Sequence, residues 1–399
     1  MTSLLIDNIG ELTTNDDELG RLRDAAVVVE GDRIVWGGSA AQAPAADDRF
    51  DAAGRAVLPG WVDSHTHMVF AGDRTAEFEA RMSGESYAAG GINVTVNATR
   101  EATDEALEAN LVRLIDEARR GGTTSIETKT GYGLTVADEV RSAQIAGRHV
   151  DAVTFLGAHL VPAGADPAKY LELVTGPMLD AVAPYVSAVD VFCETGAFDE
   201  AASRSVLEAA KRAGLATRVH GNQLGHGPGV QLAVEHGSLS VDHVAFLSDE
   251  DIAALAGSWA GSGAAVSSTG AGSSRGTVAT VLPACDLSTR MPLAPARRLL
   301  DAGAQIAIAS NCNPGTSYTS SMAFCVATAV LQMGLTIQEA VRAATLGGAV
   351  ALGMNDVGVI RPGARADLQL LEAPSVTHLA YRPGMPLTSA VWRAGTREV

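Results

Sequence analysis

The feature that most constrains the fold is an alternation of short strand-like runs with helix-patterned segments through the middle of the chain. Segments 101–120, 201–213 and 295–302 show the helical pattern. Such alternation is typical of a parallel sheet covered by helices, and eight strands of this kind predict a (β/α)8 TIM-type barrel. A doubly wound open sheet is the alternative. The strand candidates are 57–65, 124–129, 153–157, 188–193, 216–219, 239–242, 277–282 and 305–309.

Both ends of the chain have a β pattern instead. Residues 25–36 hold two β-branched runs around a Gly31-Asp32 turn signal, and 366–371 and 389–393 are strand-like. Neither end is long enough to bury a core alone. We therefore expect residues 1–57 and 360–399 to pair into a small composite β-sandwich beside a barrel of residues 58–359.

Composition narrows the possible partners and location. The net charge of −17 argues against nucleic acid, because a phosphate backbone requires a basic surface. No stretch of about 18 uncharged apolar residues is present, so we expect no membrane span. The four cysteines have no metal-like spacing, and the N-terminus does not look like a signal peptide. We expect a cytoplasmic protein.

Histidines gather where the predicted strands end. His65 and His67 follow the first strand, and side chains two residues apart share a face, so both imidazoles can point at one metal ion. A pair of structural histidines is the alternative. His159, His220 and His243 also stand at predicted strand ends. Because active sites of such barrels lie at the carboxyl ends of the strands, this grouping favours a metal site.

His65, His67 and His220 would leave one coordination position open, which is typical of a catalytic site. A divalent cation held in this way lowers the pKa of a bound water to about 7 and polarises a carbonyl group. Nitrogen ligands suit both Zn²⁺ and Fe²⁺, and they do not distinguish one from the other.

Other polar residues are expected to face the same cavity. Arg74 lies on the loop after the first strand, where its guanidinium could bind a substrate carboxylate through two hydrogen bonds. A solvated loop arginine is the alternative. Further hydrogen-bonding groups come from Tyr132, His159, Gln223, Asn313 and the turn 314–316.

Pro59-Gly-Trp-Val-Asp-Ser-His-Thr-His67 resembles the first-strand signature of the amidohydrolase superfamily. Longer matches resemble the imidazolonepropionase family within it, and they run in order through nearly the whole chain. They are Asp63-Ser-His-Thr-His-Met-Val-Phe-Ala-Gly-Asp-Arg74, Lys129-Thr-Gly-Tyr-Gly133, Phe155-Leu-Gly-Ala-His159, Asp190-Val-Phe-Cys-Glu194, His220-Gly-Asn-Gln223, Ser240-Val-Asp-His243 and Asn313-Pro-Gly-Thr316.

The resemblance implies hydrolysis of 4-imidazolone-5-propanoate to N-formimidoyl-L-glutamate at a mononuclear Zn²⁺ or Fe²⁺ site. It implies that His65, His67 and His220 bind the metal and that His243 and Gln223 take part in catalysis, His243 in proton transfer. Glu194 would support the site, or alternatively bind a second metal. A homodimer is also implied. The residues expected to contact the small anionic substrate are Arg74, Tyr132, His159, Gln223, Asn313, Gly315 and Thr316.

One position departs from the family pattern. Asn311 stands where the family has an aspartate that serves both as a metal ligand and as the base for the attacking water. An amide oxygen can coordinate weakly but takes no proton near neutral pH. Since general-base catalysis contributes ~10²–10⁴-fold, we expect slow turnover. The alternatives are a binding protein without catalytic activity, or an amidohydrolase for another cyclic amide. The Gly/Ser-rich segment 262–276 is interpreted as a surface loop.

Overall fold

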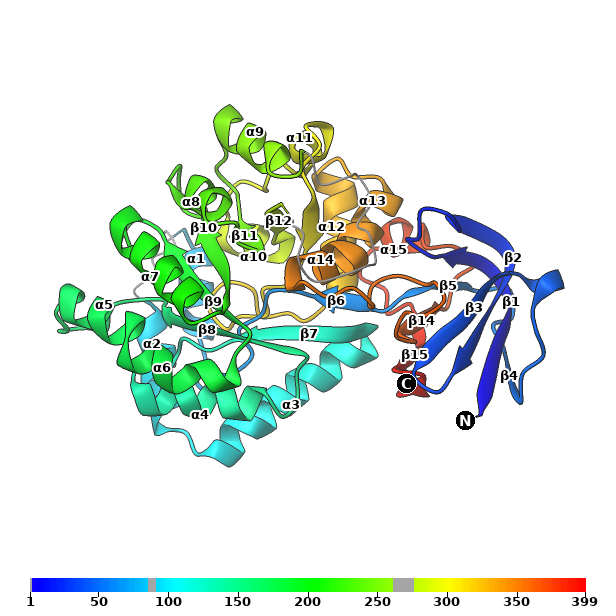
Figure 1. Cartoon of the computed structure of the whole chain (residues 1–399), viewed down its shortest axis with the longest axis horizontal. Helices are drawn as coiled ribbons and strands as arrows, with labels where there is room; N and C mark the ends of the chain where they lie inside the picture. The colour runs from blue at the N-terminus through cyan, green and yellow to red at the C-terminus, as the bar shows by residue number, and fades with distance from the viewer. Residues whose placement is uncertain (1, 85–90, 261–275) are drawn as a thin grey trace.

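The computed structural model describes residues 2–84, 91–260 and 276–399. Eight parallel strands form one sheet in chain order from β6 to β13, with helices around its outside (Figure 1). The predicted barrel is confirmed, and each of the eight expected strands is present. Their bounds are β6 Trp61–Asp63, β7 Thr123–Lys129, β8 Ala152–Ala158, β9 Ala188–Cys193, β10 Ala216–Gly221, β11 Ser240–His243, β12 Val278–Val281 and β13 Ile306–Ile308.

Amphipathic helices follow the strands and bury their apolar faces against the sheet. The α3 helix, for example, buries Leu107, Leu111 and Leu114. The helices are α1 Thr75–Met82, α2 Ile92–Glu101, α3 Asp104–Arg120, α4 Val136–Ala146, α5 Pro167–Thr175, α6 Pro177–Val182, α7 Glu200–Arg212, α8 Gly229–Glu235, α9 Asp249–Gly257, α10 Pro283–Thr289, α11 Ala296–Asp301, α12 Met322–Gln332, α13 Ile337–Arg342, α14 Gly348–Leu352 and α15 His378–Tyr381. None of the helices within the described residues is long and apolar enough to cross a membrane.

Two predicted elements are divided in the structure. The segment 101–120 contains the end of α2 and all of α3, because the Thr103 side chain accepts the Ala106 N–H and caps a new helix. The expected strand 57–65 is interrupted at Gly60, whose N–H donates to the Asp367 carbonyl. Only the part after Gly60 belongs to the barrel. The segment 262–276 falls almost entirely outside the described residues.

The first and last strands of the barrel are joined just beyond their carboxyl ends. The Asn311 N–H donates to the His65 carbonyl at 3.0 Å, and the His67 N–H donates to the Cys312 carbonyl at 3.0 Å. Below this, the Asp63 carboxylate accepts from the backbone N–H of Ser310 at 3.0 Å. The contacts that close the barrel therefore also bring the polar residues after β6 and β13 together.

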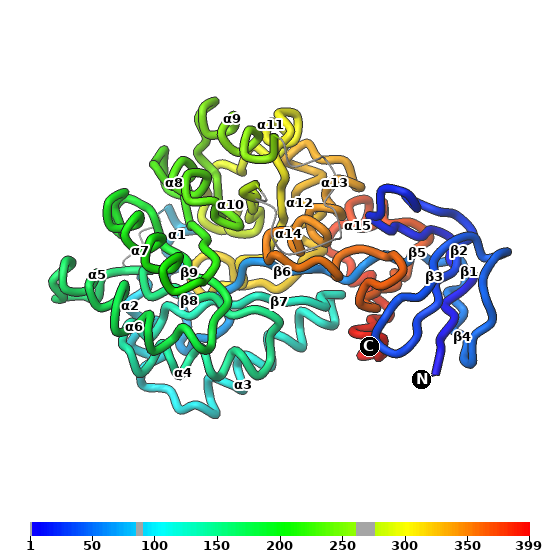
Figure 2. Tube along the Cα trace, viewed as in Figure 1, coloured from blue at the N-terminus to red at the C-terminus, as the bar shows by residue number. Residues whose placement is uncertain are grey.

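Strands from both chain ends form a second, mixed sheet beside the barrel, and both termini lie there (Figure 2). Buried residues such as Ile6, Val27, Leu368 and Trp392 form its own apolar core. The predicted pairing of both chain ends into one β unit is confirmed, and the strands, which were expected to form a sandwich, are hydrogen-bonded into a single mixed sheet. They are β1 Ser3–Thr13, β2 Arg21–Glu30, β3 Arg33–Ser39, β4 Asp48–Asp51, β5 Ala56–Pro59, β14 Leu368–Leu371, β15 Thr388–Arg393 and β16 Thr396–Arg397.

Two adjacent glycines let a helical segment lie directly on the closing strands. A Cβ at Gly347 would stand 2.3 Å from the Ile306 carbonyl oxygen, and a Cβ at Gly348 would stand 2.3 Å from that of Val62. Backbone oxygens of a closed sheet have little freedom to move away. The close approach of residues 343–352 to β6 and β13 thus requires glycine at both positions.

Gly348→Ala is expected to lower the unfolding midpoint, because overpacking of this kind costs about 1–3 kcal/mol. Gly257→Ala, in the last turn of α9, is the matched control and should cause no loss, because no described residue outside its own helix lies within 4 Å of the added methyl group. Thermal unfolding of both variants measures the difference. Equal midpoints for the two variants would contradict this packing account.

Candidate metal centre and substrate pocket

Three imidazoles meet at the carboxyl-terminal end of the barrel. His65 and His67 follow β6, and His220 lies on β10. The His67 Nε2 atom stands 3.3 Å from the Nε2 of His65 and 3.3 Å from the Nε2 of His220. All three side chains are at least 97% buried. The predicted histidines are therefore brought together by the fold.

This spacing fits a metal ion. Ligands at the usual Zn–N distance of about 2.0–2.1 Å in a tetrahedron lie about 3.3 Å from one another. Both Nε2–Nε2 distances match that edge. Three imidazoles held at these distances suit a divalent cation.

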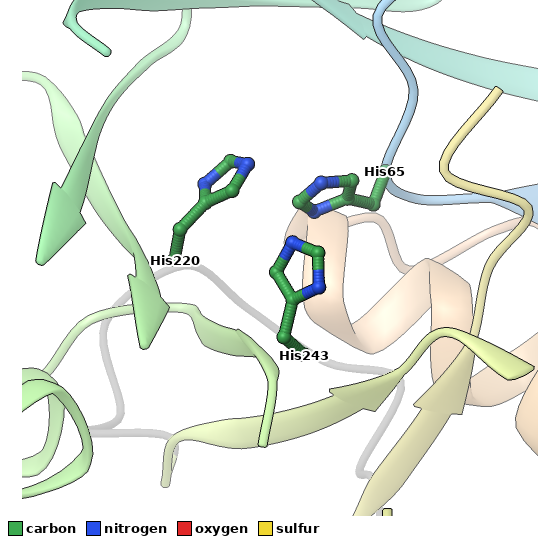
Figure 3. Close-up of side chains that lie close together, drawn as sticks. All are labelled: His65, His220 and His243. Carbon is green, nitrogen blue, oxygen red and sulfur yellow. The ribbon is translucent and has the colours of Figure 1, made fainter. Parts of the chain in front are cut away.

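His243 adds a fourth ring to the group. It ends β11 and offers one ring nitrogen within 4.8 Å of those of His65 and His220. Figure 3 shows these three rings around a common space. On the other side of the ring, the His243 Nδ1 atom lies 3.9 Å from the Cys285 thiol.

Buried carboxylates set the orientation of two imidazoles. His65 Nδ1 lies 2.7 Å from Asp242 Oδ2, and His220 Nδ1 lies 3.0 Å from Asp190 Oδ2. Asp242, by accepting the His65 Nδ1–H, leaves the Nε2 lone pair of that ring available to a metal. Burial, assisted by the charge of Lys129, holds the pKa of His65 well below its usual value. The imidazole of His65 is consequently neutral near pH 7.

Asn311 lies beside this group on the segment after β13. Its backbone is left-handed, with φ of 62°, a conformation that asparagine and aspartate adopt more readily than most residues. Its Nδ2 donates to the Thr316 hydroxyl at 3.0 Å. Its buried Oδ1 has no hydrogen-bond partner among the described residues. That oxygen is a candidate for a further weak ligand.

One pocket adjoins the histidines and collects most of the predicted substrate-binding residues. Tyr132 and His159 come from the ends of β7 and β8, and Gln223 follows β10. Gly315 lies against Arg74 instead of the pocket itself. The pocket is lined by His67, Arg74, Ile92, Tyr132, His159, Phe192, His220, Gln223, His243, Asn311, Asn313 and Thr316.

Arg74 brings a buried positive charge to the pocket. Its Nε and Nη2 both contact Glu77 Oε2, at 2.6 and 2.5 Å. Its Nη1 edge packs on Gly315, where a Cβ would stand 2.5 Å from Nη1. Glu77 thus occupies one edge of the guanidinium and fixes its plane, while Nη1 donates to the Thr95 hydroxyl at 3.4 Å.

Other contacts set the donor and acceptor groups of the pocket. His159 Nδ1 lies 3.0 Å from the Gly131 carbonyl, so Nδ1 carries the proton and Nε2 is an acceptor. Burial lowers the pKa of His159 to about 4, which keeps the ring neutral. Glu194 accepts the backbone N–H groups of Gln223 and Leu224 at 2.5 and 3.2 Å. Glu194 therefore shapes the loop that carries Gln223.

The sequence interpretation missed the charged groups beneath the histidines. Asp190, Asp242 and Lys129 are fully buried inside the barrel, although each lies in a motif singled out above. The available signal was a charged residue within a predicted barrel strand, clearest for Asp190 in the otherwise apolar strand β9. Glu127 and Lys129, two residues apart on β7, share a face and provide a further example.

The matching family model is the amidohydrolase family, over residues 56–396. Among solved structures, a triazine hydrolase variant has a TM-score of 0.75 at 18% identity, covering 100% of this chain and 95% of that one. A zinc-bound adenosine deaminase from Xanthomonas campestris has a TM-score of 0.72 at 20% identity, covering 99% and 92%. These two similarities concern the fold. The chain belongs to the amidohydrolase family.

Full-length relatives narrow this further. The imidazolonepropionase of Paenarthrobacter aurescens (strain TC1) is 66% identical over 100% of this chain and 98% of its own length. That of Saccharopolyspora erythraea is also 66% identical, over 100% and 99%. Within the amidohydrolases, the chain belongs to the imidazolonepropionases.

Zinc added to the metal-stripped protein is expected to raise the unfolding midpoint. A ligand at 100 times its Kd stabilises the folded state by about 2.7 kcal/mol. His220→Ala should lose most of this shift, because it removes one of the three converging nitrogens. His226→Ala, at an exposed position on the same loop region, should keep it. Equal zinc responses of the two variants in a thermal-shift measurement would refute the assignment.

Proposed function

We propose that the chain hydrolyses the cyclic amide of 4-imidazolone-5-propanoate to N-formimidoyl-L-glutamate with one divalent metal, Zn²⁺ or Fe²⁺. The observation that carries this proposal is the convergence of three Nε2 atoms beside a pocket that is also lined by a buried arginine. The first feature suits a hydrolytic metal, and the second suits an anionic substrate.

His65, His67 and His220 would hold the metal through Nε2, with the Asn311 Oδ1 oxygen as a weaker neighbour. When bound, a divalent ion supplies a polarised carbonyl and an activated water at neutral pH. Asp242 would keep the imidazole of His65 in the tautomer that binding requires, and Asp190 lies beside the Nδ1 atom of His220.

The pocket residues would bind and orient the substrate. Arg74, whose plane is fixed by Glu77, would bring its positive charge to the propionate carboxylate in the pocket that it lines. The neutral His159 would accept a hydrogen bond from a ring N–H through Nε2. Amide and hydroxyl groups of Asn313 and Thr316 would surround the remaining polar atoms of the ring. Together these contacts would place the ring amide beside the histidines.

Proton transfer is the step at which this chain would be weakest. The amide of Asn311 carries no basic group, so it cannot take a proton from the attacking water. His243 offers a ring nitrogen close to those of His65 and His220, and burial keeps the pKa of this ring well below its usual value. His243 would therefore be the group that receives the proton, with the amide of Gln223 as a hydrogen-bonding neighbour in the pocket. A ring with so low a pKa is a weak base, which makes turnover slow.

Asn311→Asp is expected to raise kcat by ~10²–10⁴-fold, the usual contribution of a general base. Aspartate tolerates the left-handed backbone at this position, so the fold should be unaffected. The loss of imidazolone absorbance measures the rate, and elemental analysis checks that both proteins carry equal metal. An unchanged rate would refute the role given to position 311. Product binding without turnover in both proteins would identify a binding protein.

Arg74→Ala is expected to raise KM with a smaller effect on kcat, because a charge-assisted hydrogen bond contributes about 1.5–3 kcal/mol, or roughly 10- to 100-fold in binding. Arg113→Ala, at a half-exposed arginine on α3, is the control and should leave KM unchanged. Steady-state kinetics on the imidazolone measure both variants. An unaltered KM in Arg74→Ala would rule out a carboxylate contact at this residue.

A further inference from the structure

A lysine lies buried inside the barrel, beneath the histidines. Lys129 ends β7, and its side chain has no exposed surface. Barrel interiors are normally filled by branched apolar side chains, and an unpaired buried ammonium group is costly. A charge at this position therefore calls for a physical explanation.

The Lys129 ammonium group is shared between two buried carboxylates. Its Nζ atom lies 2.9 Å from Glu127 Oε1 and 3.0 Å from Asp190 Oδ2. Neither carboxylate side chain has any exposed surface. The lysine is consequently the cation that both carboxylates share.

Each of the two carboxylates contacts a different part of the histidine group. Glu127 Oε2 accepts the backbone N–H of Thr66 at 3.1 Å, and Thr66 lies between His65 and His67. Asp190 Oδ2, the same oxygen that contacts Lys129, lies 3.0 Å from His220 Nδ1. One ammonium group thereby links the histidines after β6 to the histidine on β10.

We propose that Lys129 is a positioning residue that holds the two halves of the metal site at the spacing a divalent cation requires. It acts through Glu127 on the backbone between His65 and His67, and through Asp190 on the imidazole of His220. The proposal rests on the metal site of the proposed function and is independent of the substrate.

The energetic reason is the balance of charge in a region without water. Without the ammonium group, two buried carboxylates repel each other and lack a counter-charge, a situation that is strongly destabilising in protein interiors. In that case the two carboxylates move from their present positions. Thr66 and His220, which they contact, move as well. The histidine nitrogens lose their spacing, and metal affinity falls before any substrate is involved.

The test is zinc affinity, measured by competition with a chromophoric chelator. Lys129→Met is expected to weaken zinc binding by about 10-fold or more, in the range found when groups that support metal ligands are removed. Lys129→Arg, which keeps the charge, should bind zinc more tightly than Lys129→Met. Lys169→Met, at an exposed lysine, is the matched control and should bind zinc like the unchanged chain.

A double variant separates charge balance from simple packing. Lys129→Met combined with Glu127→Gln removes the lysine together with one of the two carboxylates that it balances. The proposal predicts that zinc affinity partly recovers relative to Lys129→Met. A purely structural lysine predicts a further loss, because the double variant removes more hydrogen bonds. The unfolding midpoints of the metal-free proteins are measured as well, and they show how far each substitution changes stability independently of zinc affinity.

Zinc affinity of Lys129→Met equal to that of the unchanged chain would overturn the proposal, and so would a double variant with no recovery. If Lys129→Met does not give soluble protein, Lys129→Gln, also uncharged, replaces it in both comparisons under the same criteria. An unchanged chain that binds no zinc would overturn this inference together with the metal site. A chain that binds zinc as predicted but does not open the imidazolone refutes only the proposed activity.

Discussion

The site depends on the closure of the barrel between its first and last strands. Beyond the ends of β6 and β13, backbone hydrogen bonds join Asn311 to His65 and His67 to Cys312. Without these bonds the two segments would not meet, and the candidate ligand at position 311 would not lie beside the histidines. The helical segment that crosses both strands approaches them through adjacent glycines. The contacts that close the barrel are thus the same contacts that assemble the site.

Below the histidines, paired charged side chains occupy positions that apolar side chains fill in an ordinary barrel. Asp242 and Asp190 orient imidazoles, and Lys129 balances the carboxylates around it. Burial holds the pKa of His65, His67 and His243 well below the usual value, which favours the neutral rings that a cation binds. The same low-polarity interior makes every unbalanced charge costly, which explains why the charged groups occur in contact with one another. A metal ion would complete this network.

The barrel and the position of the histidines could be predicted from sequence because each depends on short-range pattern. Strand–helix alternation predicts parallel strands, and parallel strands bring residues such as His65, His220 and His243 to one end. The partners of Lys129 could not be predicted in this way, since pairing between β7 and β9 side chains depends on barrel geometry. The break at Gly60 depended on a distant backbone contact with Asp367. Local sequence pattern does not contain such long-range contacts, so they could not be predicted from it.

The central claim is that one cation binds to Nε2 atoms supplied by separate strands. Anomalous diffraction at the zinc edge from zinc-loaded crystals tests it directly. The account predicts a single strong peak about 2.0–2.1 Å from the Nε2 atoms of His65, His67 and His220. A peak bound elsewhere, or one that leaves out His220, would contradict it.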